Sequence, residues 1–329
     1  MACLAAITGA TGFLGRYIVN ALAAGGWRVR ILARRPPDHP QLAHLKLEVV
    51  IGDLADRCAL RELVAGADTV IHAAALIKAP TAAAFRAVNV QGTVNLANAI
   101  KDSGGTRRVL LVSSMAAREP QLSTYAQTKR ASEEMLATLL DSRSERVVVR
   151  PCAIYGPWDR ETLGFFRTLS RGIAVRPRVA NARIGLIHAA DAAAAIATLC
   201  DRGPAGAILE LTDGRRDGYS WDEIIAAAES ALHVKTTAIS IPSAGLRAAA
   251  AVNAAAAWVL HRAPMLTPGK AREILHADWS STAARQPPRE LWQPAIELHR
   301  GFMETAHWYR DRHWISSANP LLAARGTLQ

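Results

Sequence analysis

A glycine-rich segment near the amino terminus constrains the fold of this chain more than any other feature. The segment 8–15 reads TGATGFLG, follows the apolar run Cys3–Thr8 and precedes helical spacing over Tyr17–Ala24. A turn between a buried strand and a helix directs backbone N–H groups and the positive end of the helix dipole towards one point, where a phosphate can bind. The sequence therefore predicts a strand, a phosphate-binding turn and a helix, the first unit of a doubly wound sheet.

The first half of the chain continues this alternation. Strands are expected over Arg28–Leu32, Leu47–Ile51, Thr69–His72, Arg108–Ser113 and Arg146–Arg150, and helices over Arg57–Ala65, Phe85–Lys101 and Tyr125–Asp141. Strands that alternate with helices at this spacing indicate βαβ units. We therefore expect an α/β fold, with a parallel Rossmann sheet formed by residues 1–155.

The rhythm changes after residue 155. The sequence predicts loops over Tyr155–Gly185, a helix within them over Leu163–Arg171, a strand that becomes a helix over Ile184–Ala197, and a helix over Trp221–Leu232. Ser220 and Glu223 form a capping-box pattern at the start of the last helix. We expect a smaller, mostly helical substrate-binding region over residues 156–329, from which 184–200 returns to the first domain.

The glycine-rich turn predicts a dinucleotide-binding loop. Gly9 permits the tight turn, Gly12 lets the backbone approach the phosphates, and Gly15 lets the helix pack closely on the sheet. Thr11, Phe13 and Leu14 complete the loop.

Residues after the second and third strands bear on the choice of dinucleotide. Arg34 and Arg35 follow the second strand, no acidic residue is near its end, and Arg16 is a third cation. A ribose 2′-phosphate favours Arg, whereas a free 2′-hydroxyl is usually bound by Asp or Glu. We therefore expect NADP(H), with NAD(H) as the alternative in which these arginines are solvated loop charges. Asp53 and Leu54 are expected near the adenine, although Asp53 also suits a plain turn.

A second group of residues predicts acid–base chemistry. Tyr125 and Lys129 lie near the start of an expected helix, and Ser113 and Ser114 end the strand before it. Helix positions four apart share one face, so the Lys129 ammonium is expected beside the Tyr125 hydroxyl and should lower its pKa. A serine at the carboxyl end of a strand can hydrogen-bond a substrate carbonyl.

These motifs occur together, in one order, in a known family. The sequence resembles an extended short-chain dehydrogenase/reductase over residues 4 to about 197. The matching segments are TGATGFLG, GDL at Gly52–Leu54, His72–Ala75, Asn89–Thr93, Ser113–Ser114, Tyr125 with Lys129, Arg150–Pro157 and His188–Asp191.

The resemblance implies hydride transfer at a nicotinamide. In that family a tyrosine exchanges the proton, a lysine holds the ribose and a serine orients the reacting oxygen, which here gives Tyr125, Lys129 and Ser114, with Ser113 as the alternative serine. It also implies that Ala73, Ala74 and Ala75 run along the cofactor and that Pro151 and Ala153 lie near the nicotinamide. Substrate contacts are expected from Lys78, Met115, Tyr155 and His188, the last also as a hydrogen-bonding scaffold residue.

The carboxyl-terminal half resembles the 3β-hydroxysteroid-dehydrogenase-like branch of the family. The segments that carry this likeness are Leu266–Lys270, His276–Ser280, Glu290–Pro294, Gly301–Phe302 and Trp308–Tyr309. The branch handles bulky lipophilic hydroxy or keto compounds, and bacterial ceramide reductases of similar type act on 3-keto sphingoid lipids. Two departures from the extended family stand out. Only eleven positions separate Ser114 from Tyr125, and Met115 replaces part of a longer serine/threonine run.

Two other functions remain open. A nucleotide-sugar epimerase or dehydratase would need cations for a diphosphate, for which Arg178 or Arg183 could serve. Dehydratases usually carry an acid beside the catalytic serine, and Met115 is not one. The other alternative is a cofactor-binding scaffold without turnover, which the intact Ser114, Tyr125 and Lys129 disfavour.

Composition addresses partners and location. The net charge is +11, but the basic residues are scattered and show no nucleic-acid-reading pattern, so an anionic membrane surface or simple solubility is expected to account for them. The apolar stretch 244–260 is expected either on a membrane surface or as a buried helix. The expected location is the cytoplasm, with a peripheral position on the inner membrane face as an alternative. The four cysteines form no metal-binding pattern, so no metal is expected, and family resemblance suggests a homodimer through the helices 85–101 and 125–141.

Overall fold

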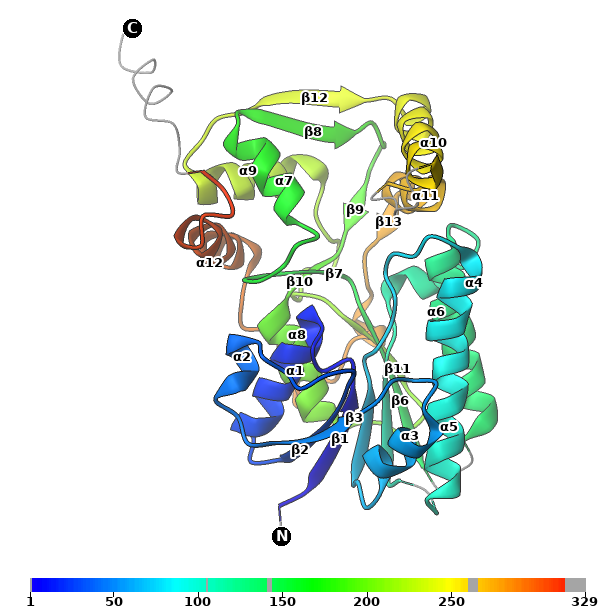
Figure 1. Ribbon diagram of the computed structural model, residues 1–329. Coiled ribbons are helices and arrows are strands. Elements are labelled where there is room, and N and C mark those ends of the chain that lie inside the picture. The colour runs from blue at the N-terminus through cyan, green and yellow to red at the C-terminus, as the bar shows by residue number, and fades with distance from the viewer. Residues whose placement is uncertain (1, 105, 141–143, 260–265, 317–329) are drawn as a thin grey trace, which may run out of the picture.

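Seven parallel strands form the central sheet of the computed structural model, which describes residues 2–104, 106–140, 144–259 and 266–316 (Figure 1). Their order is β11-β6-β5-β4-β1-β2-β3. The bounds are β1 Leu4–Thr8, β2 Arg28–Ala33, β3 Leu47–Ile51, β4 Thr69–His72, β5 Arg108–Val112, β6 Glu145–Pro151 and β11 Ile208–Leu211. The chain proceeds outwards in opposite directions from β1 and β4, so their carboxyl ends form the switch point where ligands bind in such sheets.

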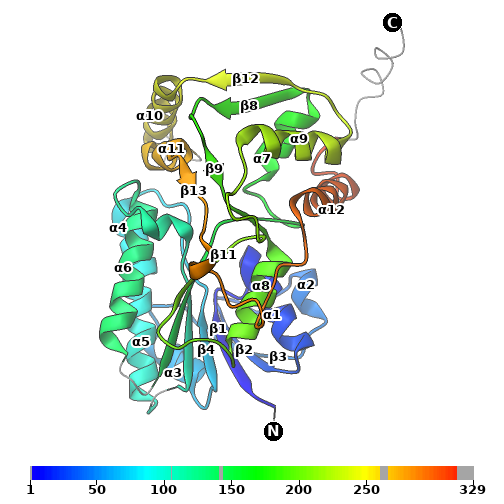
Figure 2. The same ribbon diagram turned by 180° about the vertical axis from the view of Figure 1, so that it is seen from behind.

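Helices cover both faces of this sheet (Figures 1 and 2). On one face lie α1 Phe13–Ala24, α2 Pro40–Ala43 and α8 Ala189–Leu199; on the other lie α3 Arg57–Val64, α5 Gly92–Asp102 and α6 Thr124–Leu139. Strand β1 serves both cores because successive side chains point to opposite faces. Ala5 and Ile7 pack with α1 and α8, whereas Leu4 and Ala6 pack with α3 and α5.

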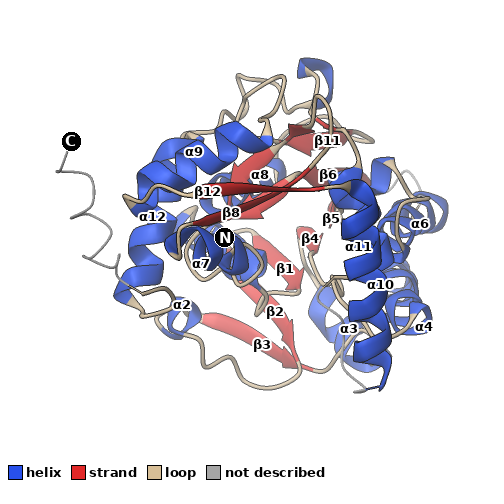
Figure 3. Ribbon diagram, turned by 90° about the horizontal axis from the view of Figure 1, so that it is seen from above, coloured by secondary structure: helices blue, strands red, loops and turns tan. Residues whose placement is uncertain are grey.

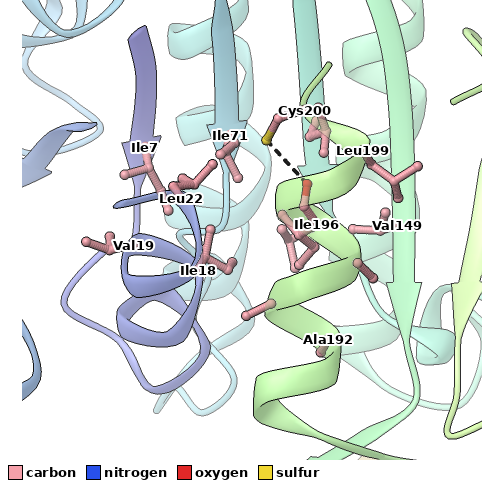
Figure 4. Packing of buried hydrophobic residues seen from close by; sticks show 14 of the residues in the cluster. Ile7, Ile18, Val19, Leu22, Ile71, Val149, Ala192, Ile196, Leu199 and Cys200 are labelled. Carbon is pink, nitrogen blue, oxygen red and sulfur yellow. Dashed lines mark hydrogen bonds between the residues drawn. The ribbon is translucent and has the colours of Figure 1, made fainter. Parts of the chain in front are cut away.

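Figure 4 shows the first of these cores. Ile18 and Leu22 of α1 and Ile196 of α8 lie over Ile7 and Ile71, and all five are fully buried. This packing brings a helix from the second half of the chain against the Rossmann sheet. Helix α8 lies within the segment 184–200, and the predicted domain boundaries stay predictions.

The helix expected over Phe85–Lys101 is interrupted. Helix α4 spans Ala82–Phe85, a π-helix spans Arg86–Gln91, and α5 follows directly. Single π-helical turns within α-helices are frequent at functional sites.

The second half of the chain contains more strand than expected. The pairs are β7 Ala153–Tyr155 with β10 Leu186–His188, β8 Ile173–Pro177 with β12 Thr237–Ile241, and β9 Arg183–Ile184 with β13 Asp278–Trp279. The prediction of loops over Tyr155–Gly185 was wrong in this respect, whereas helices still make up most of the ordered elements of this region. Strands of two to five residues are too short for a clear alternation of apolar and polar side chains. Strand β11, which joins the central sheet, was also missed.

An aromatic core holds the second region together. Helices α7 Leu163–Ser170, α9 Trp221–Leu232 and α12 Leu298–Asp311 enclose Tyr155, Phe166 and Phe302. The capping box predicted at the start of α9 is confirmed, since the Ser220 side chain and the Glu223 carboxylate each accept from the other's backbone N–H. Helices α10 Ser243–Val259 and α11 Pro268–Leu275 pack on each other at the far end of the molecule (Figure 1). Among the described helices, none is long and apolar enough to cross a membrane.

Candidate active site

The glycine-rich turn lies at the switch point of the sheet. Gly9 has a φ of +77°, and a Cβ added there would lie 2.5 Å from the backbone nitrogen of Ala74. A Cβ on Gly15 would collide with the carbonyl oxygen of Gly9. Both positions therefore require glycine, as the sequence predicted, because the chain turns sharply and helix α1 starts against the loop after β4.

The amino terminus of α1 is open to a ligand. Gly12 is the N-cap residue and exposed, no side chain caps it, and the first turn of the helix contains no acid. Thr11 is also exposed, whereas Phe13 and Leu14 are half-buried. Uncapped N–H groups at the positive end of a helix dipole fit the pyrophosphate of a dinucleotide.

The loop after β4 lies beside this turn. The Ala73 N–H donates to the Thr8 carbonyl at 3.2 Å, and the Ala74 N–H to Thr8 Oγ1 at 3.3 Å. His72 bridges Thr8 and Thr93 with its two ring nitrogens, at 2.7 and 3.0 Å. Burial lowers the pKa of His72 to about 3, so this ring is neutral and fixes the position of the loop rather than exchanging protons.

The residues predicted near the adenosine half of the cofactor lie beyond β2 and β3. Arg34 and Arg35 are exposed at the end of β2. Arg16 is buried, and its guanidinium donates to the Thr11 carbonyl at 2.8 Å and to the Gln41 side chain at 2.9 Å. The N–H group bonded to Thr11 therefore supports the glycine-rich turn. Asp53 Oδ1 accepts from the Ala55 N–H at 2.8 Å.

The hydrogen bond from the Ala55 N–H to the Asp53 side chain shows that Asp53 forms a turn, which is the alternative role that the sequence left open. Leu54 packs instead against α5, and a Cβ on Gly92 would lie 2.6 Å from its Cδ1. The predicted contacts of both residues with adenine stay predictions.

The predicted catalytic residues come together at the carboxyl end of β5 and the start of α6. The side chain of Ser114 lies near enough to Tyr125 to lower the pKa of the tyrosine hydroxyl, and both residues are half-buried. Lys129 is 3% exposed, and its Nζ donates to the Val112 carbonyl at 2.6 Å. An ammonium has three N–H donors, so this bond leaves donors available to a ligand hydroxyl.

The expected effect of Lys129 on Tyr125 is corrected by the structure. Burial raises the pKa of Tyr125 to about 12, and the nearby Ser114 side chain lowers it only in part. Burial also lowers the pKa of Lys129 to about 8, while the nearby Glu133 carboxylate raises it. Desolvation is therefore the largest effect on both groups, and Tyr125 is a protonated phenol at neutral pH.

Ser113 has a different environment from Ser114. Its hydroxyl donates to Glu133, whose carboxylate is also held by Arg150 through contacts of 2.5 and 2.9 Å. Ser113, Glu133 and Arg150 are all less than 9% exposed. This buried cluster occupies the Ser113 hydroxyl and leaves Ser114 as the serine beside Tyr125. The sequence analysis missed Glu133, although its position four residues after Lys129 on α6 was a usable signal.

Asn89 is a second residue whose role the sequence analysis did not assign. It lies in the π-helix, and its side chain accepts from the Leu76 N–H at 2.7 Å and donates to the Leu76 carbonyl at 3.1 Å. The same amide donates to Thr128 Oγ1 at 3.0 Å. Asn89 thus ties the loop after β4 to the turn of α6 that carries Lys129.

The predicted substrate residues are placed less favourably. Lys78 is half-buried and pairs with Glu161 at 2.7 Å. The other three predicted substrate residues are buried in the interior: Met115, Tyr155 and His188 are 3%, 0% and 1% exposed. They contribute to packing in this structure, and their contacts with a substrate stay predictions. His188 Nδ1 caps α8, and burial lowers the pKa of this histidine to about 4.

The residues predicted beside the nicotinamide differ in exposure. Pro151 is buried, whereas Ala153 is exposed after the end of β6. No cluster of three potential His, Cys, Asp or Glu metal ligands occurs in the part of the chain that the structure describes.

Comparisons with known proteins agree with this site. The model of the NAD dependent epimerase/dehydratase family matches residues 5–211, and the chain belongs to that family. It is an oxidoreductase that uses a nicotinamide dinucleotide.

Two curated relatives and one solved structure are informative. The chain is 44% identical to a ceramide reductase of Caulobacter vibrioides, over 94% of this chain and 95% of the relative. It is 31% identical to a farnesyl-dihydroquinoline-oxide ketoreductase of Stigmatella aurantiaca, over 63% and 67% of the two chains. The UDP-glucose 4-epimerase of Thermotoga maritima superposes with a TM-score of 0.72 at 16% identity, covering 94% and 99%, which shows the common fold.

Proposed function

We propose that this protein is an NADPH-dependent reductase of a keto group on a long-chain lipophilic substrate, with a 3-keto sphingolipid of the ceramide type as the substrate class. The observation that carries the proposal is the 44% identity to a ceramide reductase along nearly the whole of both chains. The second relative is also a ketoreductase and acts on a compound with a farnesyl chain. Apolar substrates bearing a ketone are thus common to both.

The protonation state of the site favours reduction. Bound NADPH would supply a hydride to the carbonyl carbon, and the carbonyl oxygen then needs one proton. Tyr125 holds that proton at neutral pH, since the ordinary pKa of a tyrosine, about 10, is already well above 7 and burial raises it to about 12. Ser114, which lies beside Tyr125, would donate a hydrogen bond to the same oxygen, and a donor aimed at developing negative charge stabilises the transition state.

Lys129 and the exposed arginines would hold the cofactor. The Lys129 ammonium has N–H donors that its bond to Val112 does not use, and these suit ribose hydroxyls. Arg34 and Arg35 lie exposed after β2, where the 2′-phosphate of NADPH would need cations. This pair supports the preference for NADPH over NADH.

The test is oxidation of NADPH with detergent-dispersed 3-keto ceramide, 3-keto sphingoid base or 3-keto steroid as acceptor, with NADH in parallel. We expect turnover with the sphingolipids, a faster rate with NADPH, and the 3-hydroxy lipid as product. Tyr125→Phe should lower kcat by about 10²–10⁴-fold, because it removes the proton donor while leaving the ring.

Tyr219→Phe is the matched control. The Tyr219 hydroxyl donates to Asp213 at 2.6 Å, in the second region of the fold, so its loss should leave kcat unchanged. Equal activity of Tyr125→Phe and the unmodified protein would refute the assignment of the proton donor. Turnover of UDP-glucose with recycled NAD⁺, and none with keto lipids, would replace the proposed function by that of an epimerase.

A further inference from the structure

Strands β8 and β12 and helix α10 lie together at one end of the molecule (Figures 1 and 3). Several large apolar side chains of these elements are exposed. Ile173 and Val175 are two positions apart on β8, so their side chains point to the same face of the strand. Val175 is paired in register with Ile239 of β12, so all three side chains share one face of the two-stranded ribbon of β8 and β12. They are 38%, 38% and 47% exposed, while the intervening Ala174 is fully buried on the other face.

Helix α10 follows β12 in the chain and lies at the same end of the molecule. It packs on α11, with Ala250 and Ala257 buried, and its other side is open to solvent. Val252 on that side is 71% exposed. The prediction that the stretch 244–260 is a buried helix is therefore wrong for its described part, and Leu260 lies outside the described residues.

The two segments that carry this apolar surface are basic. Residues 171–180 and 233–259 contain five Lys or Arg residues and no Asp or Glu. Arg176 pairs with Asp222. The other four cations are exposed, and none of them has an ion-pair partner among the described residues: Arg171, Arg178, Lys235 and Arg247. Apolar side chains surrounded by cations suit the interface of an anionic bilayer.

A second copy of this chain is a poorer partner for the surface. A symmetric dimer would place each copy's patch against the same patch of the other copy, and four like charges would then face four. Anionic headgroups instead neutralise the cations, while isoleucine and valine side chains enter the boundary with the acyl chains.

We propose that this end of the protein, defined by Ile173, Val175, Ile239, Val252 and the four exposed cations, docks on the surface of an anionic lipid bilayer. The carboxyl ends of the central strands, where the candidate active site lies, point towards this same end (Figure 1). Docking would therefore turn the active site to the membrane. This inference goes beyond the proposed reaction, because bilayer binding is measured without substrate or cofactor.

The test is cosedimentation of the full chain with vesicles of phosphatidylcholine alone or of phosphatidylcholine mixed with phosphatidylglycerol. We expect binding to the mixed vesicles that decreases strongly in about 1 M NaCl, where the Debye length is about 3 Å. The double variant Arg178→Glu/Arg247→Glu should lower the partition coefficient more than about tenfold, since each cation near an anionic surface contributes roughly a fivefold factor.

A matched control carries the same change in net charge at the other end of the molecule. Lys101 and Arg107 are exposed beside the amino end of β5, so Lys101→Glu/Arg107→Glu should leave vesicle binding nearly unchanged. Val252→Asp should also weaken binding, and it tests the apolar contact separately on a side chain whose replacement does not disturb packing.

Three results would overturn the proposal. The first is equal binding to neutral and mixed vesicles, and the second is equal loss in the double variant and its control. The third is a dimer in light scattering that Val252→Asp dissociates, with no vesicle binding by the unmodified protein. None of these results bears on ketone reduction in detergent, so failure of the docking surface and failure of the proposed function are distinguishable.

Discussion

Two adjacent serines provide a sharp test of the site, because the structure gives them different functions. Ser113 is 6% exposed and donates to the Glu133 carboxylate, which Arg150 also holds. Ser114 is half-buried and lies beside Tyr125. Replacing each serine by alanine removes one hydroxyl at neighbouring positions of the chain, so each variant is the control for the other.

The expected effects fall on different quantities. Ser114→Ala removes a hydrogen bond to the reacting oxygen, and loss of one such donor lowers kcat by about 10²–10³-fold. Its effect on the free energy of unfolding should be small, since the hydroxyl is half-buried and otherwise makes a 3.2 Å bond to the Ala116 N–H. Ser113→Ala leaves a buried carboxylate with one donor fewer, which should reduce the free energy of unfolding by about 1.5–3 kcal/mol.

The assay combines urea unfolding with steady-state reduction of a keto lipid by NADPH. Ser113→Ala should keep kcat within about threefold of the unmodified protein, because Arg150 still holds Glu133 in place by two contacts. The reasoning fails if Ser113→Ala loses as much kcat as Ser114→Ala while its unfolding midpoint is unchanged. That result would assign the catalytic hydroxyl to Ser113.

Three further predictions concern the cofactor site. Gly9→Ala should be less stable than Gly26→Ala by at least about 1–3 kcal/mol in urea unfolding. Both glycines have φ near +78°, but a Cβ on Gly9 would lie 2.5 Å from backbone, whereas nothing lies within 4 Å of a Cβ on Gly26. Equal stabilities of the two variants would contradict the close approach at Gly9. The kcat/KM for NADPH should fall as pH rises through about 8, because Lys129 loses its charge there, and a profile flat to pH 10 would show that its charge is not needed. Arg34→Ala and Arg35→Ala together should raise the KM for NADPH about tenfold or more with little effect on NADH, and equal changes for both cofactors would remove the 2′-phosphate from the arginines.

The parts of the site that the sequence predicts well are those fixed by local geometry. The turn at Gly9 and Gly15 follows from glycine spacing between a strand and a helix, and the structure requires glycine at both positions. The shared face of Tyr125 and Lys129 follows from the helical repeat alone. The central sheet is predictable for the same reason, since β3 and β4 have the bounds that apolar runs indicate.

Features that depend on tertiary contacts were not predictable. The pKa of Tyr125 is set by its burial, which the spacing to Lys129 does not report, and the direction of the shift was therefore wrong. Glu133 and Arg150 meet only because β6 is paired with β5 and α6 packs over both. The short strands β8 and β12 are stabilised by pairing with each other across more than sixty positions of sequence, so neither has a strong local signal.

Helix α6 connects proton transfer, cofactor binding and stability through one face. Tyr125, Lys129 and Glu133 follow one another at intervals of four residues, so each side chain lies next to the following one. The Glu133 carboxylate raises the pKa of Lys129 against the effect of burial, and thereby keeps the ammonium charged near neutral pH. Glu133 is itself fixed by Arg150 of β6 and by Ser113 at the end of β5. A change in the packing of α6 on the sheet would therefore alter both the charge of Lys129 and the position of Ser114. The buried ion pair of Glu133 and Arg150, directly behind the candidate catalytic residues, holds this packing in place.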